Sequence, residues 1–206
     1  MQHSRRQPSQ PRPLRTFIAI ELDEAVRNAL ATTQDDLRRA LPRDAVRWVR
    51  PGGIHLTLKF LGDTEVRRLD EVKQALSAAT SELRPFSFDV QGLDCFPNPR
   101  RPRVIWIGLK EPTGRLRALW QAIEDHVAPI GWPTEKRGFH PHLTLGRLQR
   151  GASVAEKQAT GRLVERANVG WLASMDVSIV SFIKSDLRPG GAVYTTLMEA
   201  QLGGQG

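Results

Sequence analysis

The chain is poor in cysteine and has no long apolar run. Cys95 is the only cysteine among 206 residues, so no disulfide can form within one chain, which favours a reducing compartment. No stretch of 18 consecutive apolar residues occurs, so no transmembrane helix is expected. The segment before residue 14 has no apolar stretch either, which argues against a secretory signal. We therefore expect a cytoplasmic protein with no membrane partner.

Acidic residues are the scarcer charge. The sequence has 30 Lys and Arg against 22 Asp and Glu, a formal net charge of +8, and 24 of the 30 basic residues are arginine. A basic surface rich in arginine suits a phosphate-rich partner such as RNA. A GC-rich genome that favours arginine codons would give the same excess, so the charge supports RNA without establishing it.

Histidine is also scarce, and its placement is informative. Two of the five histidines, His55 and His142, begin the same tetrapeptide His-Leu-Thr-Leu, 142 − 55 = 87 residues apart. Chance would place Leu-Thr-Leu after a given histidine about once in a thousand. A strand, a helix and the histidine strand occur twice in order, with 37 residues from Ile18 to His55 and 37 from Ile105 to His142. The sequence therefore predicts two related lobes, each supplying one motif.

Each motif predicts a half-buried β-strand. Apolar residues alternate with polar ones in both, and side chains two apart share a face of a strand. The alternation groups the first strand into a buried set, Ile54, Leu56, Leu58 and Phe60, and an outward set, His55, Thr57 and Lys59. In the second strand Leu143 and Leu145 are expected inward and His142, Thr144 and Gly146 outward. Each strand would present an imidazole beside a hydroxyl.

This pair of faces suits acid–base chemistry on a phosphodiester. An imidazole has an ordinary pKa of about 6.5, so one of two facing histidines can take a proton from water while the other gives one to a leaving oxygen. The hydroxyls of Thr57 and Thr144 can donate to phosphate oxygens, and Arg147 adds a fork-shaped donor. These groups would hydrolyse a phosphodiester without a metal, and a strained cyclic phosphate is the natural substrate.

The paired His-x-Thr-Leu motifs resemble those of the 2H phosphoesterase superfamily, most closely its bacterial RNA 2′,3′-cyclic phosphodiesterases, also called 2′-5′ RNA ligases. The resemblance extends from about residue 14 to 148 and continues more weakly to about 202. It includes further segments at residues 15–20, 48–51, 96–97, 101–106 and 139–142. Arg147 stands where this family has an arginine after its second motif.

The resemblance implies an α+β fold with two pseudo-symmetric lobes, whose antiparallel-rich sheets line a central groove with helices on the outside. The implied activity opens a terminal 2′,3′-cyclic phosphate on RNA to a 2′-phosphomonoester, with reversible 2′-5′ ligation of tRNA halves as a weaker implication. No metal or other cofactor and a monomeric state are expected. In family terms His55 would be the acid toward the leaving 3′ oxygen and His142 the base for water. The nearly symmetric motifs do not themselves decide between these roles.

The remaining segments complete the expected domain. A disordered basic tail is predicted for residues 1–13 and a single bilobal domain for 14–203. Helices are expected at residues 24–41, from 63 or 64, at 114–128 and at 153–166. Strands are expected at 14–22, 46–49, 85–91, 103–109, 174–184 and 192–202, the last two flanking a hairpin turn at 188–191.

Three alternatives remain open. His140 and His142 could be metal ligands if an Asp or Glu joined them. The enzyme could act on a small cyclic nucleotide or a 2′-5′ oligonucleotide, or the chain could be an RNA-binding module without catalysis. Phe139 and Trp48 are the candidates for stacking on a base, while the parity of Phe60 assigns it to the core.

Overall fold

The computed structural model describes residues 12–189 and 191–203, so nearly all of the predicted N-terminal tail lies outside the described residues. In chain order the elements are β1 Leu14–Glu21, α1 Glu24–Ala40, β2 Val46–Trp48, β3 His55–Thr64, α2 Leu69–Ser81, β4 Phe86–Phe96, β5 Val104–Lys110, α3 Arg115–Val127, β6 His142–Leu148, α4 Val154–Arg166, β7 Trp171–Val177, β8 Ile179–Arg188 and β9 Gly191–Gln201. Two single 3₁₀ turns, Pro51–Gly53 and Val66–Arg68, precede β3 and α2. Within these ranges, none of the helices is both long enough and apolar enough to cross a membrane.

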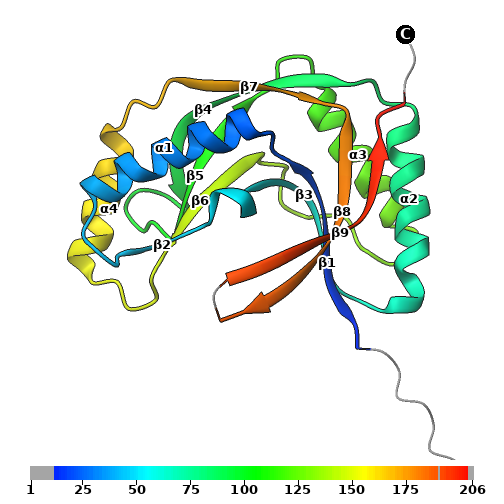
Figure 1. Cartoon of the computed structure of the whole chain (residues 1–206), viewed down its shortest axis with the longest axis horizontal. Helices are drawn as coiled ribbons and strands as arrows, with labels where there is room; N and C mark the ends of the chain where they lie inside the picture. Colours follow the sequence, from blue (N-terminus) through cyan, green and yellow to red (C-terminus); the bar gives the residue numbers. More distant parts are fainter. Residues whose placement is uncertain (1–11, 190, 204–206) are drawn as a thin grey trace, which may run out of the picture.

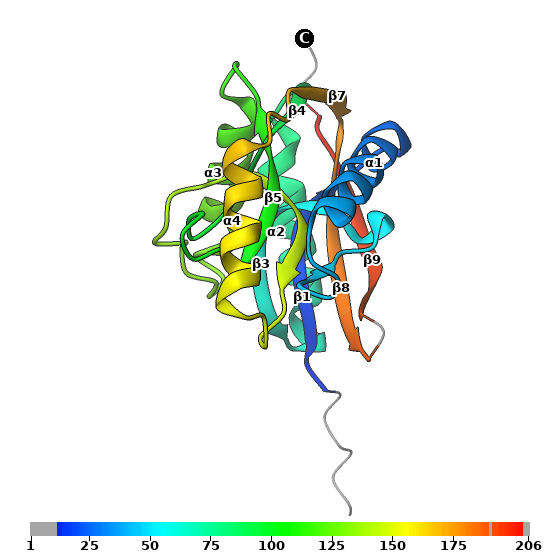
Figure 2. The ribbon, with the colours of Figure 1, turned by 90° about the vertical axis from the view of Figure 1, so that its left-hand side faces the viewer.

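One continuous sheet joins two lobes. Its strand order is β7-β4-β5-β6-β3-β1-β8-β9, with β2 paired to β6, and every pairing is antiparallel. The two histidine strands, β3 and β6, meet at the centre through a single pair, Leu56 and Leu143. The sheet curls along its length, and α2 and α3 lie side by side on one flank (Figures 1 and 2). The predicted bilobal α+β architecture is confirmed, with the two expected sheets joined into one.

The internal repeat is also confirmed. Each histidine strand pairs with the strand that begins its own half, β1 with β3 and β5 with β6. Ile18 and Ile105, which marked the repeat in the sequence, occupy these two strands and are 0% and 1% exposed. Both therefore lie in the core on the strands next to the histidine strands.

The first residues of α1 and α4 are capped as the sequence predicts, whereas α2 begins at a different residue from the predicted one. The Asp23 side chain accepts a hydrogen bond of 2.8 Å from the Val26 backbone nitrogen and caps α1, and Ser153 and Glu156 form the predicted capping box of α4. The helix expected from residue 63 or 64 begins later, at Leu69. Thr64 instead ends β3, where its hydroxyl shares a buried hydrogen bond of 2.7 Å with the Thr16 hydroxyl of β1.

The predicted strand at 174–184 is two strands. β7 ends at Val177 and pairs with β4 in one lobe, whereas β8 begins at Ile179 and pairs with β1 in the other. Residue 178 is therefore where the chain crosses between lobes. The predicted hairpin turn between β8 and β9 is confirmed by the pairing of Arg188 with Gly191.

Each histidine strand carries a β-bulge at the equivalent place. Leu58 has no partner between Thr57, which pairs with Ala19, and Lys59, which pairs with Ile18. In β6 the residue without a partner on β5 is Leu145, and 145 − 58 = 87. A bulge inserts one residue into one strand and reverses the face of the side chains that follow it.

The first bulge overturns two predictions made from parity. Lys59, expected on the histidine face, is 7% exposed and turns to the core side. Phe60, expected in the core, is 66% exposed and lies 6.2 Å, centroid to centroid, from Phe17. Strict alternation holds only up to Leu58, because the inserted residue shifts the period by one.

Candidate active site

The two catalytic candidates lie on adjacent strands at the junction of the lobes. Each histidine directly precedes one of the two leucines, Leu56 and Leu143, whose pairing joins β3 to β6. In an antiparallel pair the flanking residues run in opposite directions, so His55 comes next to Thr144 and His142 next to Thr57. All four side chains are partly buried and lie on the face opposite the buried leucines. We refer to His55, Thr57, His142 and Thr144 as the His–Thr quartet.

Both imidazoles are oriented in the same way. Nδ1 of His55 lies 3.1 Å from the carbonyl oxygen of Gly53, and Nδ1 of His142 lies 2.7 Å from that of His140. A carbonyl oxygen can only accept, so Nδ1 carries the proton in each ring and Nε2 is left for chemistry. The partner is two residues upstream in both cases, which extends the internal repeat to the tautomer of the two candidate histidines.

Aromatic rings hold each imidazole in place. His55 stacks on Phe17 with centroids 4.7 Å apart and meets the edge of Tyr194 at 5.1 Å. His142 makes an edge contact with Phe96 at 4.9 Å and a longer one with Trp106 at 6.0 Å. These contacts remove water from the two rings without hydrogen-bonding either Nε2.

The same contacts shift the titration of both histidines. Burial lowers the pKa of His55 below its ordinary value, opposed by the hydrogen bond to Gly53 and by the charge of Glu21. Burial also lowers the pKa of His142, and the charges of His140 and Arg147 lower it further, while the hydrogen bond to His140 opposes them. Desolvation disfavours the charged imidazolium, so burial favours the neutral form of both rings.

The charges around the two rings differ in sign. Glu21 of β1 is directly opposite His55 of β3, and its carboxylate also accepts a hydrogen bond of 2.9 Å from Thr196 of β9. The nearby charge at His142 is the guanidinium of Arg147 instead. A carboxylate favours the protonated imidazole and a guanidinium the neutral one, so the electrostatics separate two motifs that look alike in sequence.

The second bulge determines the direction of Arg147. Because Leu145 is the extra residue, Gly146 turns to the core side and Arg147 returns to the face of His142 and Thr144. Arg147 is exposed and close enough to Tyr194, on the opposite lobe, for its charge to act on that phenol. The phosphate-binding candidates Thr57, Thr144 and Arg147 thus share one face.

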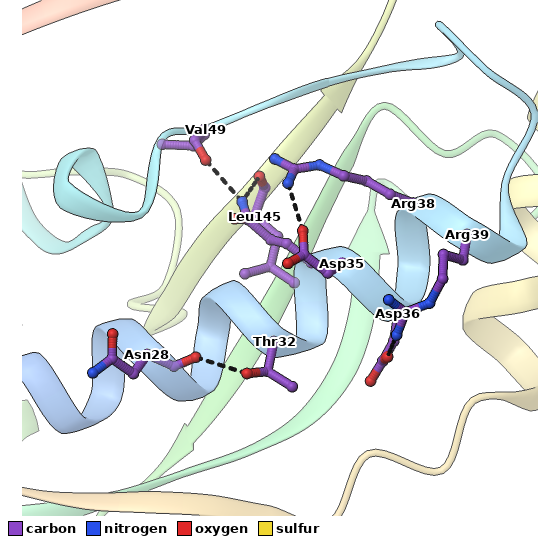
Figure 3. Close-up of polar contacts among 9 residues, drawn as sticks. Asn28, Thr32, Asp35, Asp36, Arg38, Arg39, Val49 and Leu145 are labelled. Carbon is purple, nitrogen blue, oxygen red and sulfur yellow. Dashed lines mark hydrogen bonds and ion pairs between the residues drawn. The ribbon is translucent and has the colours of Figure 1, made fainter.

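Helix α1 supports this bulge. The carbonyl oxygens of Val49 and Leu145, labelled in Figure 3, each accept a hydrogen bond of 2.8 Å from the Gln34 side-chain nitrogen, and Leu145 also accepts one from the Val49 backbone nitrogen. Gln34 is fully buried, so these bonds satisfy its nitrogen within the protein. The buried Gln34 side chain therefore stabilises the β-bulge at Leu145, and this bulge sets the direction of Arg147.

Lys59 supports the site from the core side of β3. Its ammonium donates to the Glu124 carboxylate and to the Pro133 carbonyl oxygen, both at 2.7 Å. Glu124 also accepts a hydrogen bond of 3.0 Å from the backbone nitrogen of Glu135. This buried pair joins β3 to α3 and to the loop that leads into His142, so its role is to position that loop.

The stacking candidates already have partners on one face. Phe139 is half-buried and stacks on Trp120 with centroids 5.2 Å apart. The guanidinium carbon of Arg38 lies 5.3 Å from the ring centre of the half-buried Trp48. Only the opposite faces of these two rings are left for a base.

Sequence reasoning missed several residues that contact the histidines. Tyr194, the single tyrosine, comes from β9, more than a hundred residues from His55, and no local pattern connects them. Phe17 and Trp106 lie in the recognised strand segments, and their contact with the histidines follows only from strand pairing. Glu21 could have been found by aligning β1 antiparallel to β3, which sets it opposite His55.

The metal alternative required an Asp or Glu beside His140 and His142. Residues 12–189 and 191–203 contain no group of three or more His, Cys, Asp or Glu side chains placed to hold a metal ion. His140 makes edge contacts with Phe96 at 5.5 Å and Trp106 at 5.4 Å, and its carbonyl orients His142.

Comparison with known proteins finds one family model that matches both halves of the chain, and relatives that match most of its length. The model of the family described as LigT like phosphoesterase matches the chain twice, over residues 20–106 and 107–194. The two matches are offset by 107 − 20 = 87 residues, the spacing of the two histidines. The chain is 35% identical over 185 residues to a protein of Methanothermobacter thermautotrophicus named RNA 2′,3′-cyclic phosphodiesterase, covering 89% of this chain and 96% of the relative.

Two further proteins extend the match. A Thermotoga maritima protein of the same name is 31% identical over 193 residues, covering 93% of this chain and 97% of its own. The crystal structure of the Thermus thermophilus protein TT0787 superimposes with a TM-score of 0.76 at 28% identity, covering 94% of this chain and all of that one. The similarity therefore spans both lobes.

Proposed function

The chain belongs to the LigT-like phosphoesterase family, and on this premise we propose that it is an RNA 2′,3′-cyclic phosphodiesterase. The observation that carries the proposal is the His–Thr quartet, in which two imidazoles, each bonded through Nδ1 to a backbone carbonyl oxygen, lie beside two hydroxyls on one face of the sheet. Relatives that bear this name are similar over about nine-tenths of the chain. The product is an RNA with a 2′-phosphomonoester and a free 3′ hydroxyl.

The reaction needs one proton taken and one given. His142, kept neutral by burial and by Arg147, takes a proton from water at Nε2. The water oxygen bonds to phosphorus, the bond from phosphorus to O3′ breaks, and protonated Nε2 of His55 gives its proton to O3′. Glu21 favours the protonated state of His55, which supports its assignment as the acid. The proton lost by water and the proton gained by O3′ balance.

Three side chains are assigned to the phosphate. The hydroxyls of Thr57 and Thr144 donate to the non-bridging oxygens, and Arg147 adds its charge from the end of β6. Donors aimed at developing negative charge stabilise the transition state, and no donor needs to reorganise on a rigid sheet. This arrangement needs no metal ion.

We propose that the terminal base of the RNA stacks on exposed aromatic side chains near His55, and Phe60 joins the candidates named from the sequence. Phe60 is 66% exposed and next to Phe17, the ring that stacks on His55. The free face of Phe139 remains a candidate for base stacking, whereas Trp48 packs against Gly146 on the core side of β6, away from the His–Thr quartet. An aromatic face stacks on any base, so Phe60 and Phe139 bind RNA ends without strong sequence preference.

Further properties follow from the same assignment. If the 5′ hydroxyl of a second RNA, such as a tRNA half, replaces water, the same proton transfers produce a 2′-5′ linkage. One chain supplies both histidines, so a monomer holds the complete site. The single cysteine, Cys95, is 2% exposed, and burial raises the pKa of its thiol to about 11, which suits a free thiol in the cytoplasm.

The test uses an RNA that ends in a 2′,3′-cyclic phosphate, incubated with the full chain in EDTA, followed by identification of the phosphate position in the product. The proposal predicts a 2′-phosphate. Cleavage restricted to a small cyclic nucleotide or a 2′-5′ oligonucleotide would show that the chain is a 2H phosphodiesterase with that substrate instead of RNA ends. RNA that binds but keeps its cyclic end would identify a binding module instead.

A further inference from the structure

Two arginines face each other across neighbouring strands beside the active site. Arg47, in the three-residue strand β2, is directly opposite Arg147 of β6. Residues opposite each other in an antiparallel pair lie on one face with Cβ atoms about 5 Å apart, and like charges in this arrangement are destabilising. The backbone pairing therefore holds together two groups that repel each other.

The contacts of Gly146, the residue of β6 that precedes Arg147, show on which face this pair lies. A Cβ on Gly146 would come within 2.6 Å of a Val46 methyl and 3.1 Å of the Trp48 ring, so these two side chains lie on the core side of β6. Arg47, between them in sequence, points to the opposite side. That is the side of Arg147, whose charge acts on both His142 and Tyr194.

Among the residues that the structure describes, no acid neutralises the pair. Both arginines are exposed, and the ion pairs found in the described ranges include neither of them. By contrast, Arg38, Arg39, Arg67 and Arg68 elsewhere on the surface each contact a carboxylate. A repulsive pair that is kept unneutralised at the edge of a site suits an anion that comes from outside.

The pair exists in one lobe only. The position equivalent to Arg147 in the first lobe is 147 − 87 = 60, which is the exposed Phe60, and the described strands that pair with β3 are β1 and β6. The fold is thus nearly symmetric, whereas its charge is not. The exposed residue at this equivalent position is aromatic in the first lobe, Phe60, and a guanidinium in the second, Arg147, which Arg47 accompanies.

We propose that Arg47 binds the phosphodiester on the 5′ side of the terminal nucleotide, next to the cyclic phosphate that Arg147 contacts. The proposal rests on the proposed function and names its substrate class as RNA of two or more nucleotides, in preference to a mononucleotide. Guanidinium groups bind phosphate through two parallel donors, and each contact to single-stranded RNA adds about 0.7 to the slope of log affinity against log salt.

The experiment compares two substrates, a short RNA and a mononucleotide, both ending in a 2′,3′-cyclic phosphate. In Arg47→Gln, the ratio of kcat/KM for RNA to kcat/KM for the mononucleotide is expected to fall about tenfold. The salt slope for RNA is expected to become shallower by about 0.7. The matched control is Arg117→Gln on α3, which removes the same charge from an exposed arginine outside the site and is expected to leave the ratio unchanged.

The outcomes separate this proposal from the proposed function. Failure of the wild-type protein to open either substrate contradicts the proposed function. Wild-type activity with an unchanged ratio in Arg47→Gln, or an equal loss on both substrates, overturns the role of Arg47. A melting temperature of Arg47→Gln at or above the wild-type value supports the inference, because loss of the repulsion cannot weaken the fold. A clear drop would assign Arg47 a structural role instead.

Discussion

His55 and His142 each use Nδ1 to bond the carbonyl oxygen two residues upstream, at 3.1 Å and 2.7 Å. The two histidines thus share one tautomer and the same place on their strands, which leaves Nε2 of each for the proposed proton transfers. The roles proposed for them differ because the nearby charges differ in sign: Glu21 lies opposite His55, whereas Arg147 follows His142 on the same strand.

The lowered pKa values of both histidines predict an acidic optimum. The proposed mechanism requires one protonated and one neutral imidazole, and kcat/KM reports the free enzyme. With both pKa values below the ordinary value of about 6.5, kcat/KM should be maximal below that pH and fall about tenfold per pH unit well above it. A profile of kcat/KM from about pH 4 to about pH 9 checks this. A maximum above neutral pH would contradict the burial argument.

Glu21→Gln should shift one limb of that profile. The Glu21 carboxylate raises the pKa of His55, so its removal lowers that pKa and depletes the protonated acid at a lower pH. The alkaline limb is expected to move to lower pH, with the larger loss of kcat/KM above the optimum. The matched control is Glu165→Gln, an exposed glutamate on α4, which should leave both limbs in place. Movement of the acidic limb alone would reverse the two histidine roles.

Lys59→Met should destabilise the fold strongly. The change leaves Glu124, which is 1% exposed, as a buried carboxylate without its counter-charge, and such a loss costs about 3–5 kcal/mol. Urea unfolding measures the difference. The double variant Lys59→Met with Glu124→Leu removes both charges and should recover much of the loss. A double variant no more stable than the single one would show that the ion pair is not the cause.

Much of the site was readable from sequence because the decisive residues recur in a fixed local pattern. His-Leu-Thr-Leu occurs twice, and period 2 correctly places each histidine beside its threonine on the outward face. The same period fails two residues later. The bulge at Leu58 exchanges the faces of Lys59 and Phe60, and a bulge depends on strand pairing that the local sequence does not encode.

Long-range contacts limited the prediction in the same way. Tyr194 contacts His55 only because β8 and β9 return to the first lobe after β7 has paired in the second. The crossing at residue 178 was hidden within one predicted strand, since both flanking segments favour β-structure. Arg47 likewise could not be connected with the site from the local sequence, because its partner Arg147 lies on β6, a hundred residues later in the chain.

The most direct test of the account is the turnover of an RNA with a terminal 2′,3′-cyclic phosphate by His55→Ala and by His142→Ala, in EDTA, beside the wild-type chain. The account predicts that the wild type forms a 2′-phosphate and that each variant loses about 10²-fold or more in kcat while remaining folded. Wild-type turnover by either variant, or activity that appears only when a metal ion is added, would contradict the two-histidine mechanism.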